Sequence, residues 1–196
     1  MAIVASWTPS PRESRSLSAY LTALADLGFA PLVVDSSESG QDLIWPHGLP
    51  KACLVVTRPN IGYDFGSWAH ALEDFPSLRT LNRVLLTNDS MVGPFAALTE
   101  VGAAMSSSQA DVFGLTESFQ TRRHLQSFFM CFNRGVLAEA PWVSFFDSIE
   151  HQDDKDEVVR RYELGVVRTC ERYGYSWEVL LPAESIGGVV GNPTFE

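Results

Sequence analysis

Short apolar segments alternate with helical patterns along the first half of the chain, and this alternation constrains the fold more than any other feature. The predicted strands are Ala2–Ser6, 31–34, 53–57 and 83–87. Leucines recur at helical spacing from Leu17 to Leu24, and residues 67–74 show a second helical pattern. Repeated strand–helix–strand units predict right-handed crossovers and one mixed, mostly parallel sheet with helices on both faces. We therefore expect an α/β, Rossmann-like fold.

Polar or aromatic clusters follow all four predicted strands. These clusters are Trp7, Asp35, the segment 60–64 and the segment 88–90. Ligands of parallel α/β sheets bind outside the carboxyl ends of the strands. The sequence therefore predicts one cleft around these four clusters.

Asp89 follows the fourth predicted strand, between Asn88 and Ser90. A carboxylate there can bind Mg²⁺ or Mn²⁺, which completes its coordination shell with diphosphate oxygens and water. Alternatively, Asp89 caps a turn or helix, since Asn-Asp-Ser before Gly-Pro is typical of turns. The residues alone leave both interpretations open.

Three further side chains have a functional and a structural interpretation. Asp64 is either a ligand of sugar hydroxyls or the N-cap of the following helix. Glu163 is either a general base or a carboxylate that stabilises a helix N-terminus. His124 is either a buried structural histidine or a substrate ligand.

After Pro94 the pattern changes. We expect helices over 95–105, 136–149 and 158–173, and strands over 112–115, 124–132 and 176–181. The aromatic side chains at 128, 129, 132, 145 and 146 are predicted to face the core. No internal repeat or linker interrupts the pattern, which predicts a single domain.

Composition excludes several classes of function. With 196 residues, 45% of them hydrophobic, the chain is long enough to bury a core. A net charge of −10 argues against a nucleic-acid partner. No run reaches the roughly 18–20 apolar residues of a membrane span, and the N-terminus lacks a signal-peptide pattern, so we expect a cytoplasmic protein. The cysteines at 53, 131 and 170 match no disulfide or zinc pattern, which predicts free thiols.

Five ordered segments resemble the rhamnan synthesis F family, whereas nucleophile-elbow, P-loop and G-x-G-x-x-G motifs are not found. The segments are 60–68 (NIGYDFGSW), 85–90 (LLTNDS) followed by Gly93-Pro94, 111–116 (DVFGLT), 124–129 (HLQSFF) and 162–165 (YELG). The resemblance covers roughly residues 50–185.

A second, more distant similarity is to inverting glycosyltransferases of the GT-A type, carried by the segments 33–37, 86–90 and 162–175, and it implies the following roles. Glu163 would be the catalytic base, and Asp89 would hold Mg²⁺ or Mn²⁺ on the donor diphosphate. The implied nucleotide-sugar-binding residues are Trp7, Asp35, Asn60, Gly62, Tyr63, Asp64, Asn88, Asp89, Ser90, His124 and Gln126. The segment 88–90 has one carboxylate where a fuller motif has two, so Arg58, Arg122 or Arg123 are alternative partners of the diphosphate.

The resemblance also implies substrates and partners. The donor would be a dTDP- or UDP-linked sugar, with rhamnose transferred to a cell-surface polysaccharide or a lipid-linked glycan. Such an acceptor implies peripheral association with the inner face of the membrane and other domains or subunits of a biosynthetic complex. Within one domain over 1–196, we expect a nucleotide-sugar-binding half over 1–94, an acceptor and catalytic half over 95–185 and a loose tail over 186–196.

Two other hypotheses fit the same residues. A catalytically silent nucleotide-sugar or glycan-binding module would keep the cleft without turnover. A flavodoxin-like regulatory domain would account for the first half of the chain, and it predicts an open, parallel sheet of about five strands.

Overall fold

The computed structural model describes residues 1–9, 12–37, 43–150 and 155–186. The strands are β1 Ala2–Ser6, β2 Pro31–Asp35, β3 Leu54–Thr57, β4 Arg83–Asn88, β5 Val112–Ser118, β6 His124–Leu125, β7 Phe129–Asn133 and β8 Trp177–Leu181. The α-helices are α1 Arg15–Asp26, α2 Tyr63–Asp74, α3 Thr99–Ser107, α4 Ala140–Asp147, α5 Lys155–Val158 and α6 Leu164–Tyr173. Short 3₁₀ helices cover Pro76–Thr80, Val136–Ala138 and Ala183–Ile186, and a π-helical turn covers Val159–Glu163.

One mixed sheet of eight strands joins both halves of the described chain. Its order is β3-β2-β1-β4-β7-β5-β6, with β8 paired to β5. The strands β3, β2, β1 and β4 run parallel, β7 is antiparallel to β4 and β5, and β8 is parallel to β5. The predicted α/β class with a mixed, mostly parallel sheet is confirmed. The sheet does not match the open five-stranded parallel sheet of the flavodoxin-like hypothesis.

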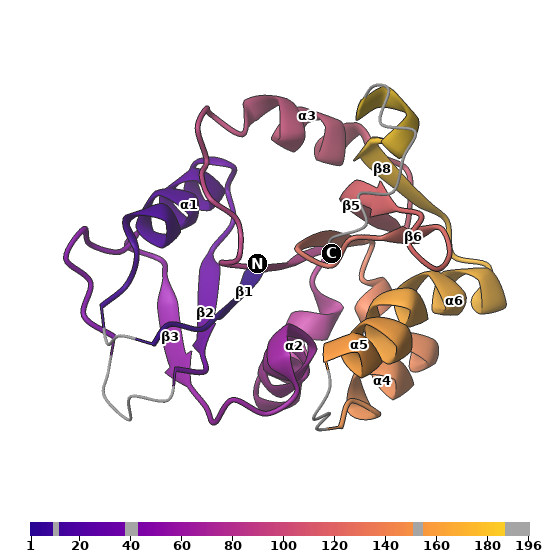
Figure 1. Ribbon diagram of the computed structural model, residues 1–196, viewed down its shortest axis with the longest axis horizontal. Coiled ribbons are helices and arrows are strands. Elements are labelled where there is room, and N and C mark those ends of the chain that lie inside the picture. The colour runs from indigo at the N-terminus through magenta and orange to yellow at the C-terminus, as the bar shows by residue number, and fades with distance from the viewer. Residues whose placement is uncertain (10–11, 38–42, 151–154, 187–196) are drawn as a thin grey trace, which may run out of the picture.

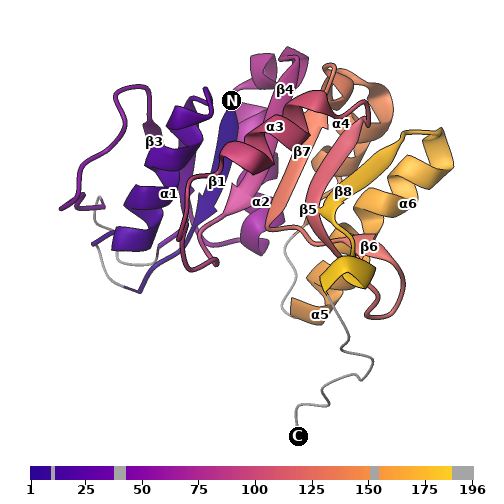
Figure 2. The ribbon, with the colours of Figure 1, turned by 90° about the horizontal axis from the view of Figure 1, so that it is seen from above.

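Helices cover both faces of the sheet. Figure 1 shows α1 and α3 on one side and α2, α4 and α6 on the other, and Figure 2 shows β1, β4, β7 and β5 as neighbours. Along β1, Ala2 and Val4 belong to the apolar cluster under α1, whereas Ile3 and Ala5 belong to the cluster under α2. Successive side chains of a strand point to opposite faces of the sheet, so β1 contributes side chains to the apolar cluster on each face.

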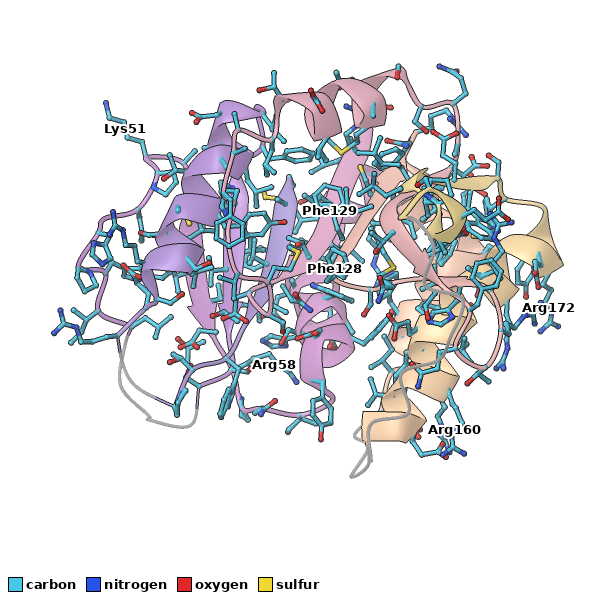
Figure 3. All side chains as sticks on the ribbon, turned by 45° about the horizontal axis from the view of Figure 1, so that its top comes forward. Lys51, Arg58, Phe128, Phe129, Arg160 and Arg172 are labelled. Atoms are coloured by element: carbon cyan, nitrogen blue, oxygen red, sulfur yellow. The ribbon has the colours of Figure 1, made fainter. Side chains whose placement is uncertain are left out.

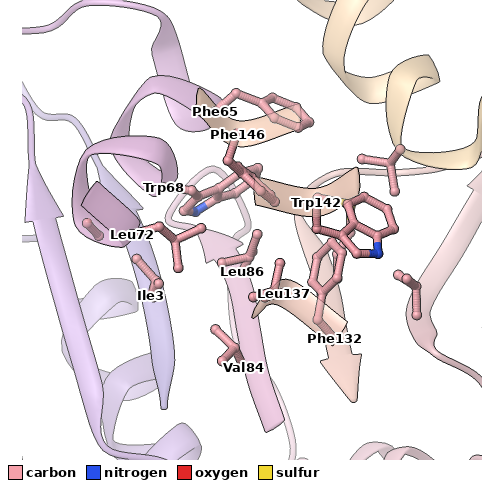
Figure 4. Close-up of a cluster of buried hydrophobic side chains, with 14 of the residues drawn as sticks. Ile3, Phe65, Trp68, Leu72, Val84, Leu86, Phe132, Leu137, Trp142 and Phe146 are labelled. Carbon is pink, nitrogen blue, oxygen red and sulfur yellow. The ribbon is translucent and has the colours of Figure 1, made fainter. Parts of the chain in front are cut away.

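The core beneath α2 and α4 combines aliphatic side chains with a group of aromatic rings (Figure 4). Trp68 and Trp142 are fully buried, and the Phe132 ring meets the Trp142 ring edge-on with 4.9 Å between centroids. The Trp68 indole donates to the Thr87 carbonyl at 3.0 Å, which satisfies its buried N–H. Of the aromatic side chains predicted to face the core, those at 129, 132 and 146 are buried and those at 128 and 145 are partly buried.

The third predicted strand is confirmed in position as β3, but its side chains are less buried than those of the other parallel strands. A continuous apolar run is typical of a strand covered on both faces, yet Leu54 is 58% exposed. The reason is that β3 is the outermost strand of the sheet, where fewer neighbours cover its side chains. An apolar run therefore predicts a strand without revealing its position in the sheet.

Three long elements predicted in the second half are interrupted. The strand expected over 124–132 is two strands, β6 and β7, separated by residues 126–128. The helix expected over 136–149 divides at Glu139, whose backbone is extended, because Pro141 takes a first-turn position in α4. The helix expected over 158–173 contains the π-helical turn.

The starts of two helices also differ from the prediction. α2 begins at Tyr63 instead of residue 67, after Gly62 in the left-handed conformation with a φ of 82°. α3 begins at Thr99 instead of residue 95. The predicted loose tail lies, from residue 187, outside the described residues.

Two expectations from composition can be compared with the structure. The three cysteines are free thiols, with Cys131 and Cys170 buried and Cys53 partly buried. In the part of the chain that the structure describes, no helix has both the length and the apolar character needed to cross a lipid bilayer.

Gly66 allows α2 to pack against the loop that precedes it. A Cβ atom at this position would lie 2.1 Å from the carbonyl oxygen of Ile61, and a backbone atom cannot rotate away. We therefore expect Gly66→Ala to lower the free energy of unfolding by about 1–3 kcal/mol, the usual cost of overpacking. Urea denaturation measures this difference. Glu73→Ala, at an exposed position of the same helix, is the control, and an equal effect of both variants would contradict the explanation.

Candidate functional site

A cavity of about 610 Å³ lies at the carboxyl ends of β1 and β4. Its lining residues are Ser6, Trp7, Thr8, Glu13, Ser14, Leu17, Ser36, Asn60, Tyr63, Asp64, Phe65, Asp89, Ser90, Ser127, Val158 and Glu163. The structure thus brings together seven of the predicted site residues: Trp7, Asn60, Tyr63, Asp64, Asp89, Ser90 and Glu163. These come from the loops after β1 and β4, from the segment before α2, from the first turn of α2 and from the π-helical turn.

Asp89 is held at the end of β4 by two donors from the end of β1. Its Oδ2 accepts hydrogen bonds from the Ser6 hydroxyl at 2.7 Å and from the Trp7 backbone N–H at 3.3 Å. Burial raises the pKa of Asp89 above its usual value, the hydrogen bonds from Ser6 and Trp7 oppose this rise, and the negative charge of Asp35 adds to it. Asp89 therefore bonds across the sheet instead of capping a following helix.

Two more carboxyl groups near this end of the sheet are buried. Asp35 is 1% exposed, and its Oδ1 accepts from the backbone N–H and the hydroxyl of Ser37 at 3.0 and 2.5 Å. Glu13 is 6% exposed and accepts from the His47 backbone N–H at 3.2 Å. Asp35 Oδ2 and Glu13 Oε2 have no hydrogen-bond partner among the described residues. Burying a carboxyl oxygen without a hydrogen-bond partner lowers the stability of the folded protein. Both of these oxygens lie near the same end of the sheet.

The segment before α2 is tied to the end of β4. The Asn88 side-chain amide donates to Asp64 Oδ2 at 2.7 Å, and Asn88 Oδ1 accepts from the Ser90 backbone N–H at 3.3 Å. Asp64 lies in the first turn of α2, and the N-cap is Gly62, so the interpretation of Asp64 as N-cap is wrong. Instead, Asn88 holds the Asp64 carboxylate at the cavity.

Glu163 reaches the cavity from the end of the π-helical turn. Its Oε1 accepts a hydrogen bond from the Ser127 backbone N–H at 2.7 Å. This bond fixes the carboxylate against the segment between β6 and β7. Glu163 also stands at the N-cap position of α6 without a side-chain capping bond, so its interpretation as a carboxylate that stabilises a helix N-terminus is compatible with this position. π-helical turns occur often at functional sites, because they reorient side chains that a regular helix would turn away.

Five predicted binding residues do not line the cavity: Asp35, Gly62, Asn88, His124 and Gln126. Asp35 and Asn88 lie directly behind it, since their chain neighbours Ser36 and Asp89 line it. His124 is 4% exposed, and its Nδ1 lies 2.6 Å from the Arg122 carbonyl oxygen, as expected of a structural histidine. Gln126 accepts from the Thr116 hydroxyl at 2.6 Å.

Sequence reasoning missed Glu13 and Ser127 as parts of the site. Glu13 lies at the far end of the loop after β1, immediately before Ser14, the N-cap of α1. Extending the strand-end rule over the whole loop up to the helix cap would have found it. Ser127 contributes its backbone N–H, and nothing about a serine side chain signals such a role.

Carboxyl groups dominate the charge of the cavity. Glu13, Asp64, Asp89 and Glu163 line it, and among the described residues no lysine or arginine does. The arginines proposed as alternative diphosphate partners are engaged elsewhere: Arg58 with Ile61 and Ser67, Arg122 with Glu171, and Arg123 with Glu117. An anionic ligand would therefore need a cation to accompany it.

A complete protein-made metal site is not found in the described part of the chain, where no three His, Cys, Asp or Glu side chains are grouped to hold an ion. Asp89 already accepts two hydrogen bonds. A divalent cation at Asp89 would take most of its ligands from a bound diphosphate and water, which is the usual coordination of Mg²⁺ in nucleotide sites.

We expect Asp89→Asn to raise the melting temperature at pH 7. The pKa of Asp89 is raised in the folded protein. The stability that this carboxyl group contributes is therefore complete below its usual pKa of 3.8, and it is lost as the pH rises through the raised pKa. Asparagine keeps an oxygen for Ser6 without the charge. Melting curves from pH 3.5 to 8 should show the gain shrinking toward acid. Asp26→Asn, at an exposed position, is the control, and a gain independent of pH would contradict the linkage.

Comparison with known sequences places these residues in context. A model of the family described as rhamnan synthesis protein F matches residues 51–195. Virulence protein VirA of Vibrio anguillarum (strain ATCC 68554 / 775) is 32% identical over 140 residues, which make up 68% of this chain and 44% of VirA. Uncharacterized protein y4gN of Sinorhizobium fredii (strain NBRC 101917 / NGR234) is 25% identical over 139 residues, 68% of this chain and 36% of y4gN. The chain thus spans less than half the length of these relatives.

Solved structures are similar only in outline. A protein from Bacillus anthracis described as a glucose-1-phosphate thymidylyltransferase aligns with 91% of this chain and 86% of its own, at 9% identity and a TM-score of 0.48. Protein A197 from STIV aligns with 91% of this chain and 81% of its own, at 10% identity and a TM-score of 0.42. Neither TM-score is high enough to inform the function of this chain.

Proposed function

The chain belongs to the rhamnan synthesis protein F family, and we propose that it is a glycosyltransferase domain of the GT-A type. Family membership supports a glycosyl function linked to nucleotide sugars and polysaccharide biosynthesis. The observation that carries the finer proposal is the shared cavity, in which Glu163 and Asp89 line the same space at the carboxyl ends of parallel strands.

The proposed reaction is a single displacement. Glu163 removes the proton from an acceptor hydroxyl, the freed oxygen attacks the anomeric carbon of the donor sugar, and the bond to the nucleoside diphosphate breaks. The carboxylate is suited to this role because the Ser127 N–H holds its Oε1 in place at the cavity. The nucleoside diphosphate leaves with the electron pair of the broken bond, and inversion at the anomeric carbon follows.

The donor would lie along the loops after β1, β4 and before α2. Trp7 is 48% exposed at the rim of the cavity, where its ring can stack on a nucleobase. Asn60 and Asp64 offer hydrogen-bonding groups to sugar hydroxyls. Because the described lining holds four carboxyl groups and no basic side chain, we propose that Mg²⁺ or Mn²⁺ accompanies the diphosphate at Asp89.

The finer assignments rest on the family. We propose a dTDP- or UDP-linked donor, rhamnose as the transferred sugar and a cell-surface polysaccharide or lipid-linked glycan as acceptor. The relatives are more than twice as long as the matched region. Acceptor elements from other domains or subunits are therefore part of the proposal, as is a place at the inner face of the membrane.

Donor binding is tested by thermal shift with dTDP and UDP, each with and without Mn²⁺. We expect a rise of about 5–10 °C at a ligand concentration about 100 times its Kd, because the ligand binds only the folded chain. The rise should require Mn²⁺ and be lost in Asp89→Ala, while Asp26→Ala keeps it. A full shift without any metal would overturn the assigned role of Asp89, and no shift with any nucleotide would overturn the donor site.

Catalysis is tested separately with Glu163→Gln. We expect transfer to fall by about 10²–10⁴-fold, the usual contribution of a general base, while the donor-induced shift is retained. Glu171→Gln, on the exposed side of α6, serves as the matched control. If wild-type protein binds donor but transfers nothing across a broad acceptor panel, the silent binding module is the better description.

A further inference from the structure

A second hollow lies on the outer flank of the molecule, between α4 and α6. It is a groove of about 490 Å³. One wall carries Arg161 from the π-helical turn and Arg168 and Arg172 from α6, where a spacing of four residues places the last two on one helix face. Gly165 allows the Phe145 ring to pack closely against α6, since a Cβ atom there would lie 2.9 Å from that ring. Both residues line the groove beside the arginines.

Among the described residues, Glu157 is the acidic partner of two of the arginines in this region. Arg160 and Arg161 share it, each at 3.3 Å. Arg168 donates to the Arg160 carbonyl at 3.4 Å, and the Arg172 guanidinium lies 5.4 Å from the centre of the Tyr173 ring. Among the described residues that line the groove, none is aspartate or glutamate.

The cationic face stands out against the rest of the chain. The whole sequence has 14 Lys and Arg against 24 Asp and Glu. Four of those basic residues, Arg160, Arg161, Arg168 and Arg172, are exposed along one short stretch. Figure 3 shows Arg160 and Arg172 on the same flank, well away from Lys51. An acidic protein with one basic flank has a single favoured orientation near a negative surface.

We infer that this arginine face, made of Arg160, Arg161, Arg168 and Arg172, docks the protein on an anionic lipid surface. Guanidinium groups pair with phosphate oxygens through two parallel hydrogen bonds. From 161 to 172 the face extends roughly 16 Å, at about 1.5 Å per helical residue, which spans several headgroups instead of one phosphate. Tyr173, 51% exposed beside Arg172, is the kind of amphipathic ring that favours a membrane interface.

This docking surface rests on the proposed function for its biological role, since a lipid-linked acceptor lies at a membrane surface. Its physical basis is independent of donor binding. Glu163 lines the cavity, whereas Arg161, two residues earlier, lines the groove. The two sites therefore lie on different sides of the same helical segment, and a protein could dock on lipid with its cavity open.

The test is co-sedimentation of the full chain with vesicles of phosphatidylglycerol and phosphatidylcholine, or of phosphatidylcholine alone. We expect binding to the anionic vesicles only, weakening as salt is added. Arg168→Gln with Arg172→Gln should lower the partition coefficient by about 25-fold, the product of about fivefold for each arginine near an anionic surface. The control, Arg15→Gln with Lys51→Gln, changes the net charge equally at exposed positions outside the groove and should bind like wild type.

Several outcomes would overturn the docking surface. These are equal binding to both vesicle types, an equal loss in the control, or no binding of the wild-type protein to anionic vesicles. Release by millimolar glycerol phosphate, at constant ionic strength, would instead identify a site for a single soluble phosphate. Thermal shift with the nucleotide donor is measured on the same arginine variant. A retained shift with lost vesicle binding separates this proposal from the donor site.

Discussion

Thr87 makes the interactions on which the arrangement of this protein depends. It is fully buried near the end of β4, where its hydroxyl donates to the Phe128 carbonyl at 2.6 Å and lies 2.7 Å from the Tyr20 hydroxyl. Its own carbonyl accepts from the Trp68 indole. One residue therefore ties α1, α2 and the segment before β7 to the central strand. The candidate site begins two residues further along the chain, at Asp89, so its walls are positioned by a satisfied polar network that specifies one packing.

The parallel half of the fold could be predicted because its signals are local. Each strand is a short apolar run followed by polar residues, and the strand-end rule then gathers Asn60, Asp64 and Asp89 without knowledge of long-range contacts. The second half could not be predicted in the same detail. Its strand breaks at 126–128, where Ser127 bonds Glu163 from 36 residues away, and no local pattern reports that bond. His124 and Gln126 do not line the cavity, because their side chains are engaged with the Arg122 carbonyl and the Thr116 hydroxyl.

The cavity illustrates how a binding site differs from a core. Asp35 and Glu13 each bury an oxygen without a partner among the described residues, and Asp89 is a partly buried acid beside them. A sequence selected for stability alone would avoid such a set of negative groups. The aromatic core below α2 and the bonds of Thr87 stabilise the fold enough to maintain it. Departures of this kind from good packing are expected where a protein binds a ligand.

The π-helical turn at Val159–Glu163 has a geometric consequence for both faces of the C-terminal helix. A π-helical turn accommodates one residue more than an α-helical turn, and each residue of an α-helix rotates the chain by about 100°. Converting the turn to regular α-helix would therefore swing Glu163 away from Ser127 or rotate Arg168 and Arg172 off their present flank. One additional residue thus sets the angle around the helix axis between Glu163, which faces the cavity, and the arginines Arg168 and Arg172, which line the groove. Deleting that residue would move either the carboxylate or the arginines out of position.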